Sequence, residues 1–326
     1  MTYLTLGASL ALAAFLVIDV IASLVSIVIW RAARGDLDRL SARARAGGLF
    51  LLRTFPSTAA TIVVVGVLLP AFCRFEPRET SEIVGDTLVG LAVVSAVLIL
   101  AGLRRGWQAS AATRSVLHDW LQHARPVALP GVSVRTYAIA SEFPVVSLVG
   151  IVRPRLFVSE RVLRACTPEE LSVMVRHERG HLASGDNLKR LSLRVCPNLV
   201  ALTSFSRDLE SRWNEACEEA ADDYAAGASM PTALALANAL LRVARMAPAR
   251  CASLASLTAL YQGGSIERRV KRLVGRDALG TSQAAWLVAV RALAAVPFVF
   301  ALAVLLDGHL LHSVHHLIEV VVQTMP

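Results

Sequence analysis

Two histidines and a glutamate in the middle of the chain have the spacing of a zinc-binding motif. His177-Glu178-Arg179-Gly180-His181 reads H-E-x-x-H. Residues four apart in a helix share one face, so His177 and His181 can bind a single zinc ion. Glu178 can then act as the catalytic base on a water molecule without being a ligand. The pattern predicts zinc-dependent peptide hydrolysis, and the alternative is a solvated helix face with this sequence by chance.

A third protein ligand is expected, because catalytic zinc sites usually have three and keep one position open. The histidines between residues 309 and 316 follow the last apolar segment, and we expect them on the other side of a membrane. Glu218 and Asp222 are better placed, since they lie four residues apart in an acidic run. We expect Glu218 to bind zinc and Asp222 to accept a hydrogen bond from a ligand imidazole. An exposed acidic helix face is the alternative.

Local signals predict the elements that position these residues. Thr167-Pro168-Glu169-Glu170 is a capping box with proline at the first helical position, so the helix that carries the motif is expected to begin there. Short strands are expected over residues 132–139, 144–149 and 155–158. Further helices are expected at 108–124, 187–206, 208–227, 231–246 and 265–275.

The second of these strands is a candidate binding surface for substrate. Pro144 at its start favours the edge of a sheet. An edge strand can pair with an extended peptide, and a strand buried in the core is the alternative. The residues that would pair with the substrate are Val145, Val146, Ser147 and Leu148.

The composition indicates a membrane protein. Hydrophobic residues make up 55% of the 326 residues and charged residues 18%, against about 25% charged in a soluble domain. Apolar segments long enough to cross a bilayer cover residues 3–30, 54–73, 87–103 and 284–306. The net charge of +8 comes from arginines beside these segments. That distribution favours contact with membrane lipid over direct binding of nucleic acid.

The arginine distribution also predicts the orientation. Residues 31–53 and the pair Arg104-Arg105 are rich in arginine and are expected in the cytoplasm, with both termini outside. The chain then divides into three parts. These are a membrane region with three transmembrane helices (1–106), a cytoplasmic α+β peptidase domain (107–280), and a fourth transmembrane helix with a short extracytoplasmic tail (281–326). The fold class expected is a mainly α membrane protein with a zincin-like domain inserted between its third and fourth spans.

Several motifs together resemble the BlaR/MecR family of integral-membrane zinc peptidases of bacteria. Residues 174–181 followed by Gly185-Asp186-Asn187-Leu188 resemble its active-site helix, and Val152–Ser159 resembles the strand before it. Residues 218–222 resemble its E-x-x-[AC]-D motif, and residues 266–273 resemble the basic segment that ends the peptidase region. The resemblance covers roughly residues 84–306. It implies Zn²⁺ as cofactor, Glu218 as third ligand, Asp186 beside the site, and a location in the bacterial inner membrane.

The resemblance implies regulated cleavage of a protein, in sensor members often a winged-helix transcriptional repressor. Only about 20 residues follow the fourth span, where sensor members carry a penicillin-binding domain, so this route of β-lactam sensing is not supported. HtpX-type or CAAX-prenyl-type proteases of quality control or processing are the second choice, since they share H-E-x-x-H and E-x-x-A-D. A non-catalytic membrane signalling protein with a peptidase-like domain is the third.

Two charged residues lie inside apolar segments. Asp19 is in the first segment and Arg291 in the fourth. Ionisable residues within a bilayer tend to have partners. One hypothesis is therefore that Asp19 and Arg291 pair and hold the first helix against the fourth. The alternative is that Arg291 reaches the cytoplasmic interface alone and Asp19 is protonated or faces a polar neighbour.

Overall fold

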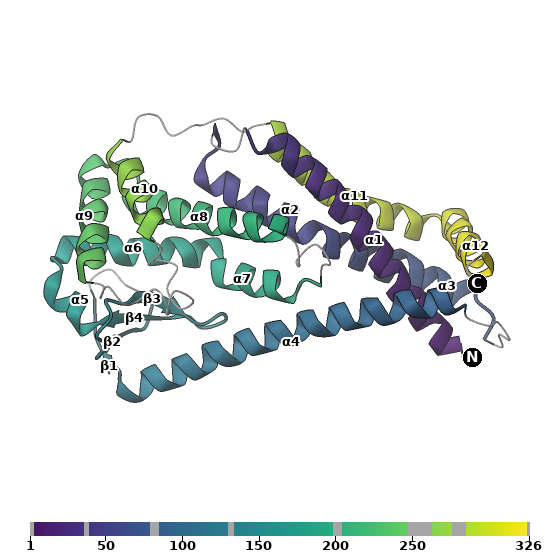
Figure 1. Ribbon diagram of the computed structural model, residues 1–326, viewed down its shortest axis with the longest axis horizontal. Helices are drawn as coiled ribbons and strands as arrows, with labels where there is room; N and C mark the ends of the chain where they lie inside the picture. The colour runs from purple at the N-terminus through teal and green to yellow at the C-terminus, as the bar shows by residue number, and fades with distance from the viewer. Residues whose placement is uncertain are drawn as a thin grey trace.

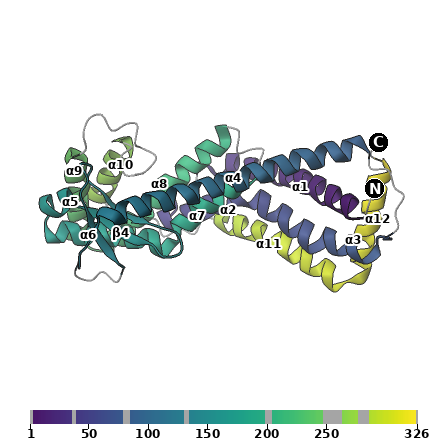
Figure 2. The same cartoon turned by 90° about the horizontal axis from the view of Figure 1, so that it is seen from below.

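The chain was analysed as a computed structural model that describes residues 3–35, 39–78, 85–129, 134–197, 204–246, 263–275 and 285–324. The molecule is elongated, with a small sheet and short helices at one end and apolar helices at the other (Figures 1 and 2). The elements are α1 (Tyr3–Ala33), α2 (Ala42–Val63), the π-helical turn η2 (Val64–Leu68), α3 (Leu69–Phe75), α4 (Asp86–His123), β1 (Arg125–Pro126), β2 (Thr136–Ile139), β3 (Val146–Val149), β4 (Arg155–Ser159), α5 (Glu160–Ala165), α6 (Pro168–Ser184), α7 (Asp186–Val195), α8 (Ser204–Ala226), α9 (Met230–Met246), α10 (Gly263–Val274), α11 (Ala285–Leu306) and α12 (Gly308–Thr324).

Four helices are long and apolar enough to cross a membrane, in agreement with the four expected segments. They cover Tyr3–Ala32, Ala42–Phe75, Asp86–His123 and Leu287–Leu306. The second runs through α2, η2 and α3, and is longer than the segment at 54–73 because it begins among the arginines that follow α1.

The third spanning helix does not end at its arginine pair. Residues 87–103 and 108–124 were expected as two helices with a domain boundary at 106, but α4 is one helix of 38 residues. Gly106 lies between the two expected helices, but a single glycine lowers the stability of a helix by only about 1 kcal/mol, so the helix continues through it. α4 therefore reaches from the apolar end of the molecule to the sheet (Figure 1).

The proposed pairing of Asp19 with Arg291 is wrong. Ser57 Oγ on α2 donates a hydrogen bond to Asp19 Oδ1 at 3.0 Å, and Asp19 is buried between α1 and α2. Arg291 is exposed on α11. The hydrogen-bond partner of the buried carboxyl group is thus a hydroxyl on the adjacent helix and not Arg291.

The tail after the fourth span is helical. α12 packs against α3 and α11 at the apolar end of the molecule, beside both chain termini (Figure 1). Leu311 and Ile318, seven residues apart, are buried on its inner face. This amphipathic spacing explains a helix where the sequence analysis expected only a short tail.

The sheet has the strand order β1-β2-β4-β3, so β3 is an edge strand. β2 and β4 are parallel, and β1 and β3 run antiparallel to their neighbours. The expected strands at 144–149 and 155–158 correspond to β3 and β4. The expected strand at 132–139 is observed as β2, and residues 132–133 lie outside the described residues.

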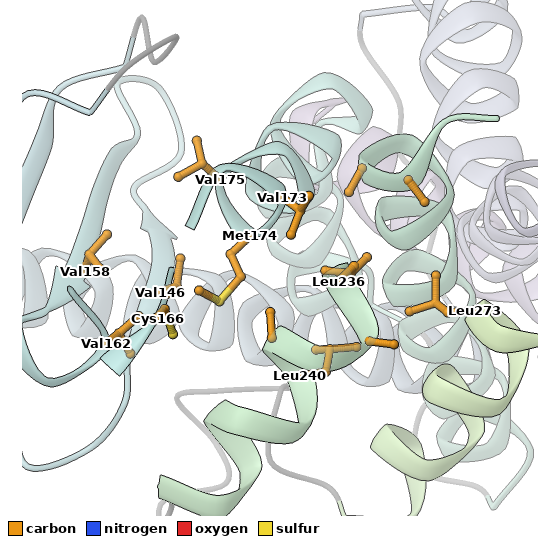
Figure 3. Packing of buried hydrophobic residues seen from close by; sticks show 14 of the residues in the cluster. Val146, Val158, Val162, Cys166, Val173, Met174, Val175, Leu236, Leu240 and Leu273 are labelled. Carbon is orange, nitrogen blue, oxygen red and sulfur yellow. The ribbon is translucent and has the colours of Figure 1, made fainter. Parts of the chain in front are cut away.

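Alternate residues of β4 pack into two different hydrophobic clusters, one on each face of the sheet. Leu156 and Val158 of β4 pack with Met174 of α6 and with α9, as Figure 3 shows for part of this cluster. Phe157 faces the other way and contacts Trp120 at the end of α4, with ring centroids 5.1 Å apart. Because successive side chains of a strand point to opposite faces, β4 packs against α6 on one face of the sheet and against α4 on the other.

Candidate metal centre

α6 holds the H-E-x-x-H motif as a helix with well-defined ends. The expected capping box is present: Thr167 Oγ1 accepts from Glu170 N–H, and the Glu170 side chain accepts from Thr167 N–H. Gly185 ends the helix with φ of 67°, a left-handed conformation that favours glycine. Between these ends, His177 and His181 lie one turn apart, with their Nε2 atoms separated by 3.2 Å.

α8 brings Glu218 to the two histidines. Glu218 Oε2 lies 3.5 Å from His177 Nε2, and Oε1 lies 3.6 Å from His181 Nε2. Close approach of α6 and α8 depends on Gly180, where a Cβ atom would lie 3.0 Å from Ala221 Cα. The glycine inside the motif therefore has a packing role.

The donor set fits a tetrahedral metal ion. His177, His181 and Glu218 are the one group of three potential ligands found in the described part of the chain, with ligand atoms within 4.8 Å of one another. Donors about 2.0–2.1 Å from a tetrahedral zinc lie roughly 3.3 Å apart, close to the separations seen here. Glu218 Oε2 is buried 3.1 Å from Arg269 Nη1 and 3.5 Å from His177 Nε2. A metal ion bound here would share this carboxylate with Arg269.

Two further carboxylates hold the imidazoles from behind. Asp222 Oδ1 lies 3.0 Å from His177 Nδ1, and Asp186 Oδ2 lies 2.7 Å from His181 Nδ1. A carboxylate at Nδ1 fixes the ring orientation and leaves Nε2 for the metal. Asp222 and Asp186 thus lie where the sequence analysis expected them, one behind each histidine.

Arg269 is a site residue that sequence reasoning missed. It comes from α10, is 3% exposed, and donates to both oxygens of Asp222 at 2.6 and 2.7 Å. Its Nη1 also lies 3.1 Å from Glu218 Oε2. The segment 266–273 carries four basic residues, and α10 has a strongly amphipathic pattern, but neither feature distinguishes Arg269 from its neighbours.

The electrostatics of the cluster keep its acids ionised. Burial alone would raise the pKa of Asp222, but Arg269 and His177 outweigh it and hold that pKa at about 2. Burial likewise opposes ionisation of Glu218, and His177, His181 and Arg269 hold its pKa well below the usual range. For His177, the carboxylates overcome burial and raise the pKa to about 9. Two carboxylates, the protonated His177 and Arg269 thus balance one another, and a metal ion bound here would release the imidazole proton of His177.

Glu178 lies between the metal cluster and the edge strand. It is 7% exposed, and its Oε2 accepts a hydrogen bond of 2.9 Å from the backbone N–H of Leu148. Asn187 Nδ2 donates to the carbonyl oxygens of Leu148 and Gly150 at 3.3 and 2.9 Å. The outward backbone groups of Leu148 are therefore bound to α6 and α7, so a peptide would have to displace Asn187 to pair there.

The proposed substrate strand combines edge position with burial. Val145 is buried just before β3, Val146 and Leu148 are buried within it, and Ser147 is partly exposed. A small pocket of about 30 Å³ adjoins the strand, lined by Val146, Met174, His177, Glu178 and residues of α9. The strand is thus at the edge of the sheet with most of these side chains buried, and its pairing with a substrate stays a prediction.

The other acids near Glu218 point away from the histidines. Glu219 pairs with Arg45 at the start of α2, and Glu215 pairs with Arg268. The C-terminal histidines lie on α12, at the opposite end of the molecule from α6 (Figure 1). Glu218 is therefore the acid of α8 that lies near the Nε2 atoms of both histidines, while Asp222 lies at Nδ1 of His177.

Comparison with known proteins gives no relative. A scan against models of protein families, a search of curated proteins and a search of solved structures each find no match. The motif resemblance remains a prediction, and the functional argument depends on the geometry of the metal centre.

Proposed function

We propose that this chain is a membrane-embedded zinc endopeptidase that hydrolyses a protein or peptide substrate at the cytoplasmic face. The observation that carries the proposal is the convergence of three donor residues beside a buried glutamate: the two Nε2 atoms are 3.2 Å apart, and each lies 3.5–3.6 Å from an oxygen of Glu218. Carboxylates behind both imidazoles support it, because an acidic helix face arising by chance would not orient two histidines.

Each residue has a distinct part in the reaction. His177, His181 and Glu218 would hold zinc, which when bound supplies Lewis-acid polarisation of a carbonyl and a reactive water near neutral pH. Glu178 Oε2 accepts from Leu148 N–H, which leaves Oε1 to take a proton from the attacking water. Glu178 then passes the proton to the leaving nitrogen. Glu178 and His177 are 7% and 4% exposed, so little bulk water has access to this transfer.

The decisive variant is Glu178→Gln. It retains the three ligands, so we expect wild-type zinc content with cleavage of an unfolded protein substrate slower by about 10²–10⁴-fold, the usual contribution of a general base. The control is Glu169→Gln, which changes an exposed glutamate in the first turn of the same helix. Zinc is measured by mass spectrometry on purified protein and cleavage by peptide mapping. Wild-type cleavage by Glu178→Gln protein contradicts the proposal.

The cytoplasmic location is a separate part of the proposal. It is supported by the arginines at the start of α2 and at Arg104-Arg105, which flank spanning helices on the side of the metal centre. We expect a reporter fused after Gly264 to be active in the cytoplasm and one fused to the C-terminus to be active outside. The reverse result overturns the orientation without affecting the chemistry.

A further inference from the structure

A cleft of about 430 Å³ lies between α4, β3 and α7. One wall is the part of α4 that follows Arg105, including Thr113 and Trp120. The second wall is β3 with the residues after it, and the third is the face of α7 that carries Arg190 and Arg194. The cleft is large enough for several residues of an extended peptide.

The cleft reaches the metal centre at two points. Leu148, which lines it, is the residue whose N–H is bound to Glu178. Arg190, on the opposite wall, has Nη2 at 3.8 Å from Glu218 Oε1. A chain lying in the cleft would therefore pass beside both the catalytic glutamate and a metal ligand.

The charged side chains that line the cleft are all positive. Among the described residues that line it, the charged ones are Arg190 and Arg194. They are four residues apart on α7 and so share a face. Arg190 Nη2 is buried with no hydrogen-bond partner in the described part of the chain, and the exposed guanidinium of Arg194 forms no ion pair with any described residue. Arg194 is therefore available for a carboxylate, whereas Arg190 already lies 3.8 Å from the carboxylate of Glu218.

α7 is a rigid wall because α4 crosses it closely. A Cβ atom at Gly102 would lie 2.3 Å from the carbonyl oxygen of Val195, and one at Gly106 would lie 2.4 Å from Val195 Cγ2. Arg105 Nε also donates to the carbonyl oxygen of Arg194 at 3.4 Å. The two arginines are thus presented from a backbone fixed against a spanning helix.

We propose that the cleft binds the acidic flank of an extended peptide substrate, with Arg194 as the group that recognises its carboxylate and Arg190 beside it. The proposal rests on the endopeptidase function and names its substrate class. Arg194 lies about 6 Å beyond Arg190 along α7, and an extended peptide advances about 3.3 Å per residue. The preferred acidic residue is therefore one to three residues from the scissile bond.

The test uses full-length, zinc-loaded protein in phosphatidylcholine nanodiscs. A random peptide mixture first defines a cleaved sequence, and matched peptides then carry Glu, Gln or Lys at the positions flanking the cleaved bond. We expect the KM for the best Glu peptide to be about tenfold below that for its Gln version, because charge-assisted bonds to carboxylates are the stronger kind. Arg194→Gln should bring that ratio close to one, and Arg194→Glu should reverse the preference toward Lys.

The control variant is Arg207→Gln, which removes an exposed arginine of α8 that does not line the cleft, and it should keep the wild-type ratio. Equal KM values for Glu and Gln peptides with wild-type protein overturn the cleft proposal and leave the endopeptidase intact. If zinc-loaded protein cleaves no peptide, the endopeptidase proposal fails. The cleft is then judged by fluorescence anisotropy with labelled Glu and Gln peptides, where equal affinity overturns it.

Lipid phosphate is the competing anion, because α4 is a spanning helix. If the arginines bind lipid, wild-type and Arg194→Gln proteins will differ in affinity for phosphatidylglycerol vesicles, and the Glu to Gln ratio will be close to one. That pair of results also overturns the proposal. A Glu preference that persists in phosphatidylglycerol nanodiscs supports the peptide.

Discussion

Two histidine and carboxylate clusters lie at opposite ends of this molecule, and they differ in how the imidazoles are held. At one end, His177 and His181 each have a carboxylate on Nδ1 and turn Nε2 toward Glu218. At the other, His315 of α12 turns Nε2 toward Glu319 and Glu76 at 3.4 and 3.9 Å. Its buried Nδ1 has no hydrogen-bond partner within the described ranges.

The difference shows why a count of histidines does not define a metal site. Three donor atoms meet in the α6–α8 cluster because two further acids fix the rings and the helices cross at a glycine. The α12 cluster has donors of the same types, yet among the described residues it forms no group of three within 4.8 Å. The two clusters contain the same types of residue, and what distinguishes them is whether three ligand atoms lie close together.

The largest difference is expected in metal affinity. His181→Ala removes one of three ligands, and we expect zinc affinity to fall on the order of 10²–10³-fold, since the binding free energy is shared among few ligands. His315→Ala is the matched variant and should leave the affinity unchanged. Competition with a chromogenic chelator measures both. A comparable loss of zinc in His315→Ala would erase the distinction between the clusters.

A second test concerns Arg269, which donates to Asp222 beside the metal centre. Arg269→Gln leaves Asp222 and Glu218 as buried anions, so we expect the metal-free protein to lose about 3–5 kcal/mol of stability, the usual cost of breaking a buried ion pair. Zinc should recover part of this loss, because it neutralises Glu218. Thermal melting with and without EDTA measures the effect.

The neighbour Arg268 provides the control for that test. It pairs with Glu215 at the surface and is about half exposed, so Arg268→Gln should change stability by less than about 1 kcal/mol. Equal melting temperatures for the Arg268 and Arg269 variants would show that the buried pair contributes nothing specific.

A smaller effect is expected from the acid behind His177. Asp222→Asn keeps an oxygen near Nδ1 but removes its charge, and we expect about 10–100-fold weaker zinc binding or activity. Asp223→Asn is the control, because Asp223 pairs with Arg272 away from the histidines. If both variants bind zinc as the wild type does, the carboxylate behind His177 does not tune the metal.

Local signals in the sequence predicted much of this centre. The capping box fixed the start of α6, and the four-residue spacing of His177 and His181 placed two imidazoles together. The spacing of Glu218 and Asp222 did the same on α8. Each prediction used the period of one helix, and helix periodicity is a property of short stretches of chain.

What could not be predicted depends on contacts between distant segments. Arg269 reaches Asp222 across 47 residues of sequence, and nothing local separates it from the arginines beside it. The cleft between α4 and α7 exists because α4 continues beyond the membrane segment as one helix. Asp19 accepts from a hydroxyl of the adjacent helix, and the sequence could not decide between such a polar neighbour and Arg291. Such pairings are set by tertiary packing, which a single sequence does not display.

The smallest effect is expected at the α12 cluster itself. His315 is 5% exposed beside the ring of Phe75, whose centroid is 5.7 Å away, and one imidazole nitrogen is buried unpaired. An apolar ring of similar size avoids burying that polar atom, and the contacts that are lost, from Nε2 to Glu319 and Glu76, are longer than a normal hydrogen bond at 3.4 and 3.9 Å. We therefore expect His315→Phe to change the free energy of unfolding by less than about 1 kcal/mol.

His181→Phe, in contrast, should abolish zinc-dependent stabilisation. Melting curves recorded with and without zinc compare the two variants directly. A loss of several kcal/mol in His315→Phe would mean that the contacts of His315 with Glu76 and Glu319 hold α12 in place.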